Sequence, residues 1–600
     1  MASENSPTAL FKRSGRLLYR KYREFFLPTL LASISSSMAI IIDSIIVGNM
    51  LGSNEMASVN LCLPVMQAYI TLAILVGMGS STLIAIALGR RDAATANSIF
   101  TTAALVALFF GLLLTVVMVP FSDSISRLLT TDQTLLPLVS SYIHVFLYGG
   151  VLFFFVPIFA YILRTDGMVK LASMLLIITN LVNLLLDIVF IGPCGMGIAG
   201  SALATVCGYA AGAGFLIFYA CSKRRTLHFV PLLRRPWKET LSRIGKIVNS
   251  GFPAALSGAL ITVKILCINL LIGYLSGNSG LIVFSVCLSC LSFVSMFISG
   301  TAGAMMPIMG TLYGERDFKG VKLIFGYTLR FALLMTAGII VLFEFMPAHV
   351  FALFGVTDPE LLIVGIPSLR LFSISLFGVT ISFLLIFHYM TIQRQLIAST
   401  LSALEGVLVL IPAAWLLSSV MGITGVWLAF ILAEIVALCV TYMISRKVVK
   451  RSGGKYQDML LIERNDPQLL CDISLKATKQ NASNLSTEVI QVLKNCSLDD
   501  SIAMKAGIAL EEMIDNAATY VLNRKHTVDV DVRISSIEEG VVISMRDNGV
   551  YFNPLEYQAE EKEFSIDGIM LLRAIASKLT YNRVLALNQT LIVINKDKNI

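Results

Sequence analysis

The stretch FFLPTLLASISSSMAIIIDSIIVGNM, residues 25–50, decides the fold of this chain. It is about as long as a helix that crosses a bilayer, and almost all of it is apolar. One carboxylate, Asp43, lies deep inside it. A charge at that depth costs roughly 2.5–3.5 kcal/mol on insertion scales, so Asp43 needs a partner, a cavity or a proton. We therefore predict a membrane helix with a functional acid; the alternative is a permanently protonated Asp43 that only hydrogen-bonds a neighbouring helix.

The whole composition is that of a polytopic membrane protein. Of its 600 residues, 56% are hydrophobic and 14% are charged, whereas soluble proteins carry about 25% charged residues. The net charge of +8 lies mainly in short loops and does not indicate a nucleic-acid partner, and the ten scattered cysteines suggest no disulfide framework. The apolar runs of spanning length lie near 25–50, 60–88, 98–121, 139–163, 168–191, 197–221, 248–275, 281–312, 323–346, 363–390, 396–420 and 424–445.

Basic loops alternate with loops that hold few or no lysines or arginines. Under the positive-inside rule this alternation predicts an even number of crossings, with both termini in the cytoplasm. The basic segments are the tail 1–24, the loops 89–92, 164–170 and 314–322, the inter-lobe linker 222–247 and the linker 446–465.

The membrane part repeats itself at a constant offset of 225 residues. Matched pairs include Gly89 with Gly314 and Arg91 with Arg316, and a Met-Gly-Ile sequence recurs at 196–198 and 421–423. Each repeat holds six runs, an even number, so both halves insert with the same orientation. We expect an all-α membrane protein of about 12 helices in two six-helix lobes, 25–221 and 248–445.

Three further polar residues lie deep in the first lobe. Asn183 and Asp187 are four residues apart on one helix face, and Thr205 lies in the next run. Together with Asp43 they form an oxygen-rich cluster that could hold Na⁺ or take up a proton. Asn183 and Thr205 could instead be ordinary hydrogen-bonding groups between helices.

Residues 20–445 resemble the multidrug and toxic-compound extrusion (MATE) family of cation-coupled efflux transporters. The motifs that carry the resemblance are Pro28 with IIDSIIVG at 41–48, VGMGSSTLIAIALGRRD at 76–92, LRTDG at 163–167, NLVNLLLDIVFIG at 180–192, GIAGSALAT at 197–205, GFP at 251–253 and YGERD at 313–317. The resemblance implies an antiporter in which Na⁺ or H⁺ drives export of an organic, cationic, drug-like substrate. It also implies that the coupling ion binds at Asp43, Asn183, Asp187 and Thr205, joined by Tyr142.

The second lobe lacks this acid site. Ile268 stands where the repeat would place Asp43, and Pro412 where it would place Asp187. The polar candidates there are Lys264, Glu405, His388 and Glu434. Lys264 and Glu405 could pair across the bundle, or one could face the substrate.

Residues 466–600 predict a soluble α/β domain, with strands at 528–535 and 540–545 and a helix at 498–522. The domain resembles the Bergerat-fold ATP-binding domains of anti-sigma-factor serine kinases through KAGIALEEMIDNAATYVL at 505–522, MRDNGVYFNP at 545–554 and DGIMLL at 567–572.

This second resemblance assigns a role to each matching residue. It makes Glu512 the residue that activates a nucleophile and Asn516 the Mg²⁺ ligand, with adenine bound by Asp547 beside Gly549. Phe552 and Gly568 match the rest of the ATP site. The domain departs from the family's usual residues at Tyr520 and Ile566. No Walker A motif is present, so ATP and Mg²⁺ are expected to regulate transport and not to drive it.

Two other functions fit the same residues. The bundle could be a membrane sensor whose C-terminal domain acts as a serine kinase on a small partner protein. It could also be a flippase for a lipid or a lipid-linked precursor. In every case we expect a multi-pass protein of the bacterial plasma membrane.

Overall fold

The computed structural model describes residues 13–222, 225–231, 236–464, 468–496, 498–519, 528–556 and 568–595. The chain forms two compact units. The larger unit holds residues 24–317 and 324–463, and it is helical. The smaller unit contains a β-sheet and combines residues 13–23 and 318–323 with the described residues after Glu463.

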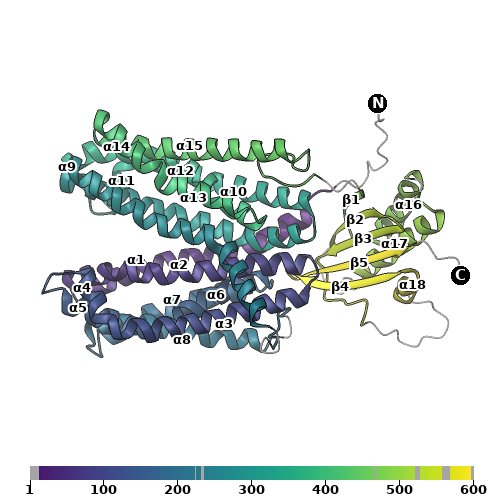
Figure 1. Ribbon diagram of the computed structural model, residues 1–600, viewed down its shortest axis with the longest axis horizontal. Helices are drawn as coiled ribbons and strands as arrows, with labels where there is room; N and C mark the ends of the chain where they lie inside the picture. Colours follow the sequence, from purple (N-terminus) through teal and green to yellow (C-terminus); the bar gives the residue numbers. More distant parts are fainter. Residues whose placement is uncertain are drawn as a thin grey trace. The chain divides into compact units, whose positions relative to one another are not determined.

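The helical unit consists of two bundles, α1 to α8 and α9 to α15 (Figure 1). The bounds of the helices are α1 Arg16–Met50, α2 Ser53–Gly89, α3 Ala93–Met118, α4 Ser122–Leu129, α5 Leu136–Tyr148, α6 Gly150–Thr165, α7 Val169–Ile191, α8 Gly197–Ala220, α9 Trp237–Gly314, α10 Phe318–Phe345, α11 Pro347–Leu353, α12 Pro359–Thr391, α13 Gln395–Ala403, α14 Leu410–Met421 and α15 Ile423–Arg451. A 3₁₀ turn, η1 (Val119–Phe121), and a π-helical turn, η2 (Leu404–Leu408), interrupt them.

Ten of the described helices are long and apolar enough to cross a membrane, and the bent pair α5 and α6 raises this number to eleven. The sequence predicts about twelve, and the difference arises in α9. This helix has 78 residues and breaks at Gly277, whose φ of 55° is not helical. Because one crossing needs about 20 residues, α9 is long enough to contain both of the predicted runs 248–275 and 281–312.

The predicted run 139–163 is not one straight helix. It bends by 57° between α5 and α6. The bend lies at Gly149 and Gly150, where other helices come very close. A Cβ on Gly150 would lie 2.6 Å from Thr115 Oγ1, and a Cβ on Gly149 would lie 2.7 Å from Val206 Cγ2. The two glycines therefore allow a bend that the apolar pattern does not reveal.

The internal repeat is visible in the backbone. Arg91 and Arg316, which the offset pairs, have left-handed φ values of 59° and 56°. The paired glycines Gly89 and Gly314 pack against each other, since a Cβ on Gly314 would lie 3.0 Å from the Cα of Gly89. The two halves thus meet at equivalent positions of α2 and α9.

A buried carboxylate ties the inter-lobe linker to the first bundle. Asp166, just after α6, accepts hydrogen bonds from the Tyr219 hydroxyl (2.9 Å) and from the backbone N–H (3.1 Å) and hydroxyl of Thr226. Burial raises the pKa of Asp166 to about 6. Further along, the N–H of His228 donates to Asn97 Oδ1 at 2.8 Å. These contacts fix the first residues of the linker.

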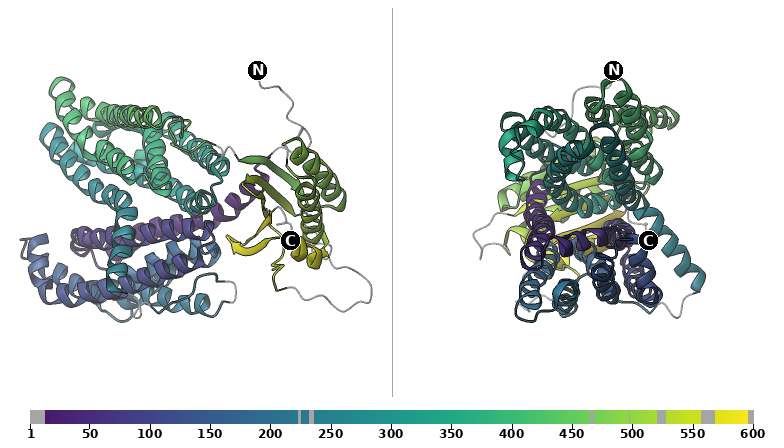
Figure 2. Two further views of the ribbon diagram at one scale, coloured as in Figure 1. Left: turned by 45° about the vertical axis from the view of Figure 1, so that its right-hand side comes forward. Right: turned by 90° about the vertical axis from the view of Figure 1, so that its left-hand side faces the viewer.

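The smaller unit contains a five-stranded sheet in the order β1-β2-β3-β5-β4, with all neighbours antiparallel. Its strands are β1 Leu469–Lys476, β2 Asp529–Ile537, β3 Gly540–Asp547, β4 Lys578–Val584 and β5 Leu587–Asn595, and its helices are α16 Lys479–Asn495, α17 Asp500–Thr519 and α18 Gly568–Ile575. The left view of Figure 2 shows the helices on one face of the sheet. The predicted α/β character of this region is confirmed at the level of a C-terminal sheet with helices.

Side chains alternate between the two faces of the sheet, as strand geometry requires. Ile473, Val532 and Met545 lie in a core shared with α16 and α17. Asp472 precedes Ile473 on β1, and Asp531 precedes Val532 on β2. Their side chains therefore point to the other face of the sheet, away from this core. The unit also includes the first turns of α1, which begins at Arg16 and not, as the sequence suggests, after residue 24.

Candidate functional site

The predicted polar residues of the first bundle come together. Asn183 Nδ2 on α7 donates to Asp187 Oδ2 at 3.1 Å and to Thr205 Oγ1 on α8 at 3.2 Å. Ser201, one turn before Thr205, donates to Asp43 Oδ1 on α1 at 3.4 Å. Three helices therefore supply one cluster of oxygen atoms, which we call the acid cluster (Asp43, Asn183, Asp187, Ser201 and Thr205).

The two carboxyl groups of the acid cluster lie close enough to interact directly. Asp187 is fully buried, and its Oδ1 has no hydrogen-bond partner among the described residues. Tyr142 is also fully buried beside the two acids and next to Thr205. Two carboxylates in contact repel each other when both are charged, so the cluster requires a proton or a cation.

Small residues allow α8 to approach α7 at the acid cluster. A Cβ on Gly208 would lie 2.6 Å from the carbonyl oxygen of Thr179 and 2.9 Å from Asn183 Cβ. Only glycine fits this spacing without a shift of the helices. Gly208 thereby brings Thr205 within hydrogen-bonding distance of Asn183.

A large cavity of about 1440 Å³ lies in the helical unit and is lined by both bundles. Serine, methionine and phenylalanine side chains make up much of its wall. Among the described residues, the charged side chains that line it are Arg164, Lys264 and Glu405. Small-molecule sites usually have volumes of about 300–1,000 Å³, so the cavity has room for a large organic substrate.

Lys264 and Glu405 both line this cavity, and their charges lie close enough to interact. Glu405 lies in the π-helical turn η2, and its Oε2 is buried without a hydrogen-bond partner among those residues. Glu434 lies close to Glu405 and accepts a hydrogen bond of 2.7 Å from Ser382. Both alternatives for Lys264 and Glu405, an ion pair across the bundle and contact with the substrate, stay predictions.

His388 does not lie with Lys264 and Glu405 on the wall of the cavity. It is fully buried on α12, and its Nε2 lies 2.8 Å from the carbonyl oxygen of Leu460. The neighbouring Tyr389 hydroxyl donates to the carbonyl oxygen of Met459 at 2.8 Å. This pair fixes the segment that follows α15 and does not line the cavity.

The sheet unit has a narrow pocket at the predicted nucleotide site. Its wall includes Asn516 on α17, Asp547 at the end of β3, and Gly549 and Phe552 in the loop that follows. Asp547 Oδ1 accepts hydrogen bonds of 2.8 Å from the N–H of Gly549 and from Asn588 Nδ2. Burial raises the pKa of Asp547 to about 6. The free space is about 20 Å³, roughly enough for one water, so a larger ligand requires the pocket to widen.

Glu512 and Gly568 are also close together. A Cβ on Gly568 would lie 1.7 Å from Glu512 Oε2, so a larger residue at the start of α18 would displace the Glu512 carboxylate. Asn516, one turn from Glu512, has a buried Nδ2 without a hydrogen-bond partner in the described part of the chain. The departures at Tyr520 and Ile566 lie outside the described residues.

Comparison with known families decides the identity of the helical unit. The MatE family model matches residues 28–189 and again residues 253–416, which together are more than half of the chain. The chain belongs to the MatE family. The double match agrees with the internal repeat and supports the resemblance to MATE transporters. The match ends at residue 416, before the first strand of the sheet unit.

Relatives of this MatE chain are drug exporters. The multidrug export protein MepA of Staphylococcus aureus (strain MRSA252) is 25% identical over 434 residues, covering 71% of this chain and 94% of its own. The MepA protein of Staphylococcus haemolyticus is 25% identical over 435 residues, covering 71% and 93%. The family and these relatives support a multi-pass membrane transporter of the drug/cation antiporter class.

Solved structures show the same fold. An outward-facing multidrug resistance MATE family transporter of the MOP superfamily superposes with a TM-score of 0.67 at 22% identity, covering 72% of this chain and 96% of its own. A MOP superfamily transporter from Pyrococcus furiosus, for which reverse polarity of the binding pocket suggests a different function, gives a TM-score of 0.66 at 22% identity and the same coverage.

The sequence analysis of this MatE chain did not single out Ser201 of the acid cluster or Arg164 of the cavity wall. Ser201 was detectable, because it lies four residues before Thr205 on the same face of α8. Arg164 could not be recognised from the sequence, because the motif LRTDG alone does not show that this side chain lines the cavity.

Proposed function

We propose that this protein is a secondary antiporter of the bacterial plasma membrane that exports organic substrates in exchange for Na⁺ or H⁺. The observation that carries the proposal is the gathering of Asp43 and Asp187 into one hydrogen-bonded cluster of α1, α7 and α8, where two carboxyl groups cannot both stay charged without a counter-ion. Both termini lie in the cytoplasm, as the basic loops favour. The substrate occupies the cavity between the bundles.

In this mechanism the acid cluster (Asp43, Asn183, Asp187, Ser201 and Thr205) controls the position of α1. Uptake of a proton or of Na⁺ removes the repulsion between Asp43 and Asp187, so α1 can repack against α7 and α8. Pro28 lies inside α1 and donates no backbone hydrogen bond, which makes it a natural point for bending. Bending reshapes the cavity wall and releases the substrate, and the two lobes then exchange access.

The test is transport in proteoliposomes with Na⁺ and pH gradients imposed separately. We expect one gradient to drive uphill accumulation of ethidium and the other to have no effect when membrane potential is held constant. An ionophore that removes the effective gradient should stop accumulation. Transport that is unaffected by both gradients would contradict the proposal.

We further propose that the sheet unit is a nucleotide-binding regulatory domain. The pocket supplies a buried carboxylate, Asp547, that could accept from an adenine amino group. The amide oxygen of Asn516, beside Glu512, could hold Mg²⁺, which would neutralise phosphate charge when bound. The contact of Gly568 with Glu512 shapes this end of the pocket. A small regulatory partner protein would bind the same unit.

A second substrate class is favoured by the charges on the cavity wall. Arg164 is 9% exposed, and the described residues offer it no carboxylate partner. Lys264 adds another positive charge to the wall. The Arg164 guanidinium lies 5.6 Å from the centre of the Tyr161 ring, a contact that leaves its charge without a counter-ion among the described residues. A buried cation in this situation favours an anionic ligand, as a flippase for a lipid-linked phosphate would require.

Arg164→Gln separates the two substrate classes. If the cavity binds anionic amphiphiles, the variant should bind anilinonaphthalene sulfonate about tenfold more weakly, because a charge-assisted hydrogen bond is lost, and should bind ethidium as before. Fluorescence titration of the purified full-length protein measures both. Unchanged binding of the sulfonate would exclude Arg164 as an anion site and leave cationic drugs as the substrates.

A further inference from the structure

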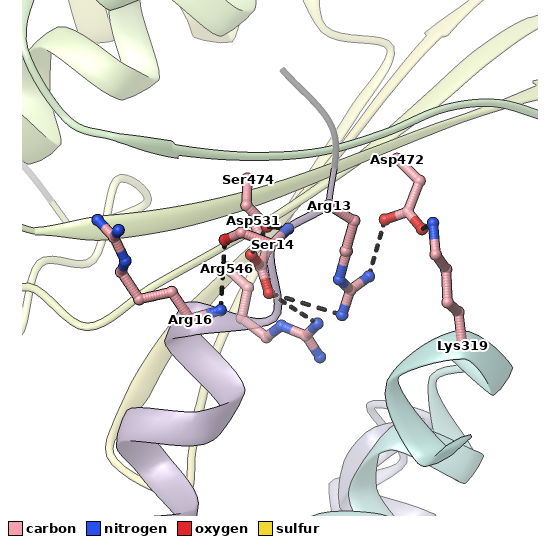
Figure 3. Close-up of polar contacts among 8 residues, drawn as sticks. All are labelled: Arg13, Ser14, Arg16, Lys319, Asp472, Ser474, Asp531 and Arg546. Atoms are coloured by element: carbon pink, nitrogen blue, oxygen red, sulfur yellow. Dashed lines mark hydrogen bonds and ion pairs between the residues drawn. The ribbon is translucent and has the colours of Figure 1, made fainter. Parts of the chain in front are cut away.

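A charged network crosses three strands of the sheet, on the face opposite α16 and α17 (Figure 3). Arg13 Nη1 lies 2.8 Å from Asp472 Oδ1 on β1, and Arg13 Nη2 lies 3.6 Å from Asp531 Oδ2 on β2. Arg546 Nη2 on β3 lies 3.4 Å from the same Asp531 oxygen. Lys319 Nζ lies 3.2 Å from Asp472 Oδ2. We call Arg13, Lys319, Asp472, Asp531 and Arg546 the charge clamp.

The charge clamp is largely shielded from water. The side chains of Arg13 and Asp531 are 0% and 2% exposed, and that of Asp472 is 9% exposed. Removal of one partner from such a buried pair leaves an uncompensated charge, so the groups hold one another firmly in place. Two more contacts strengthen the arrangement: the Ser14 N–H donates to Ser474 Oγ at 3.2 Å, and Arg20 pairs with Asp529 at 3.6 Å.

One carboxylate of the clamp joins two helices from different halves of the repeat. Arg13 directly precedes α1, the helix that carries Asp43 and Pro28. Lys319 is the second residue of α10, which belongs to the second half. Asp472 uses one oxygen for Arg13 and the other for Lys319. The starts of α1 and α10 are therefore held together through a single side chain of the sheet.

The clamp and the pocket share a strand. Arg546 and Asp547 are consecutive residues of β3 and so point to opposite faces of the sheet. Arg546 stands directly opposite Asp531 in the register of β2 and β3. Asp547, on the other face, lines the pocket with Asn516 and Phe552. A displacement of the end of β3 that widens the pocket would also move Arg546.

We propose that the sheet domain is a ligand-released restraint on the transporter. While the clamp is closed it holds the starts of α1 and α10 together and slows the exchange of access between the lobes. The closed state leaves about 20 Å³ in the pocket, so a nucleotide binds more tightly to a state in which β3 has moved. A ligand with such a preference shifts the population toward the released state and speeds transport. This inference rests on the nucleotide-binding role proposed above.

The test compares the full-length parent with three full-length variants in proteoliposomes, with and without a non-hydrolysable ATP analogue on both sides. Lys319→Gln removes the α10 link of the clamp at a side chain that is 46% exposed, so folding should survive. Arg20→Gln is a second, equally exposed variant of the same restraint. Lys494→Gln is the matched control, because it breaks an exposed pair with Asp500 in the same unit but outside the clamp.

We expect the analogue to raise gradient-driven ethidium efflux by the parent and by Lys494→Gln about threefold, the scale of one partly exposed ion pair. Lys319→Gln and Arg20→Gln should transport faster without the analogue and respond less to it. Binding of a fluorescent ATP analogue is measured in the same samples. Binding without any change in efflux would overturn the restraint and leave nucleotide binding intact, whereas absence of binding would remove both.

Discussion

Asp43→Asn is expected to abolish uphill efflux in proteoliposomes. Asparagine has nearly the shape of aspartate but cannot take up a proton or offer a charge to Na⁺. The neutral side chain also removes the repulsion from Asp187 that ion binding would otherwise relieve. The loss of one charged contact, roughly 1.5–3 kcal/mol, should weaken coupling-ion affinity about 10- to 100-fold. The readout is ethidium accumulation against its gradient.

Asp187→Asn should behave like Asp43→Asn, and the double variant should be no worse than either, because the two carboxyls act as one unit. Asp132→Asn is a suitable control, since Asp132 lies in an exposed loop and its carboxylate accepts hydrogen bonds from the N–H and the hydroxyl of the nearby Thr134. Full coupling in the double variant would mean that the acid cluster is structural.

Asp547→Asn is expected to weaken nucleotide binding by roughly 10- to 100-fold, the effect of losing a hydrogen bond to a charged group. The Gly549 N–H and Asn588 already donate to one oxygen of Asp547. An asparagine in the same orientation would present an NH₂ donor where the second oxygen now accepts. Titration of the full-length protein with a fluorescent ATP analogue measures the effect. Asp500→Asn, with a side chain 74% exposed, is the control.

The pH dependence gives an independent check of Asp547. Because burial raises its pKa to about 6, the carboxylate that accepts from a ligand is lost below that pH. Nucleotide binding should therefore strengthen as pH rises from 5 to 7. The contribution to folding has the opposite sign: a raised pKa stabilises the fold at low pH, and this stability is lost as pH rises through 6. Both trends should disappear in Asp547→Asn, and binding independent of pH would argue against this carboxylate as the ligand acceptor.

The acid cluster could be predicted because its spacing is local. Asn183 and Asp187 are one helical turn apart, and charged residues inside apolar runs stand out against their surroundings. The packing of α1, α7 and α8 against one another could not be predicted from the sequence. The close approach at Gly208 depends on which helices are neighbours, and the sequence gives no such pairing.

The charge clamp shows the limit of sequence reasoning more clearly. Arg13 looks like one of several basic residues in a tail, and Asp472 lies in a segment for which the sequence analysis predicts no strand. Their contact spans 459 residues of sequence. No periodicity links such positions, and a positive charge near an apolar run is fully accounted for by the positive-inside rule. The bend at Gly149 and Gly150 is hidden for a similar reason, since the apolar pattern continues through it.

The packing of Gly89 against Gly314 has a consequence for the origin of the chain. These glycines occupy the same position in the two copies of the repeat, so the contact is between a site and its own duplicate. Contacts of this kind arise at the two-fold axis of a homodimer, where one surface meets itself. A half-length ancestor with this fold would have paired through the same glycine before gene duplication joined its two subunits into one chain.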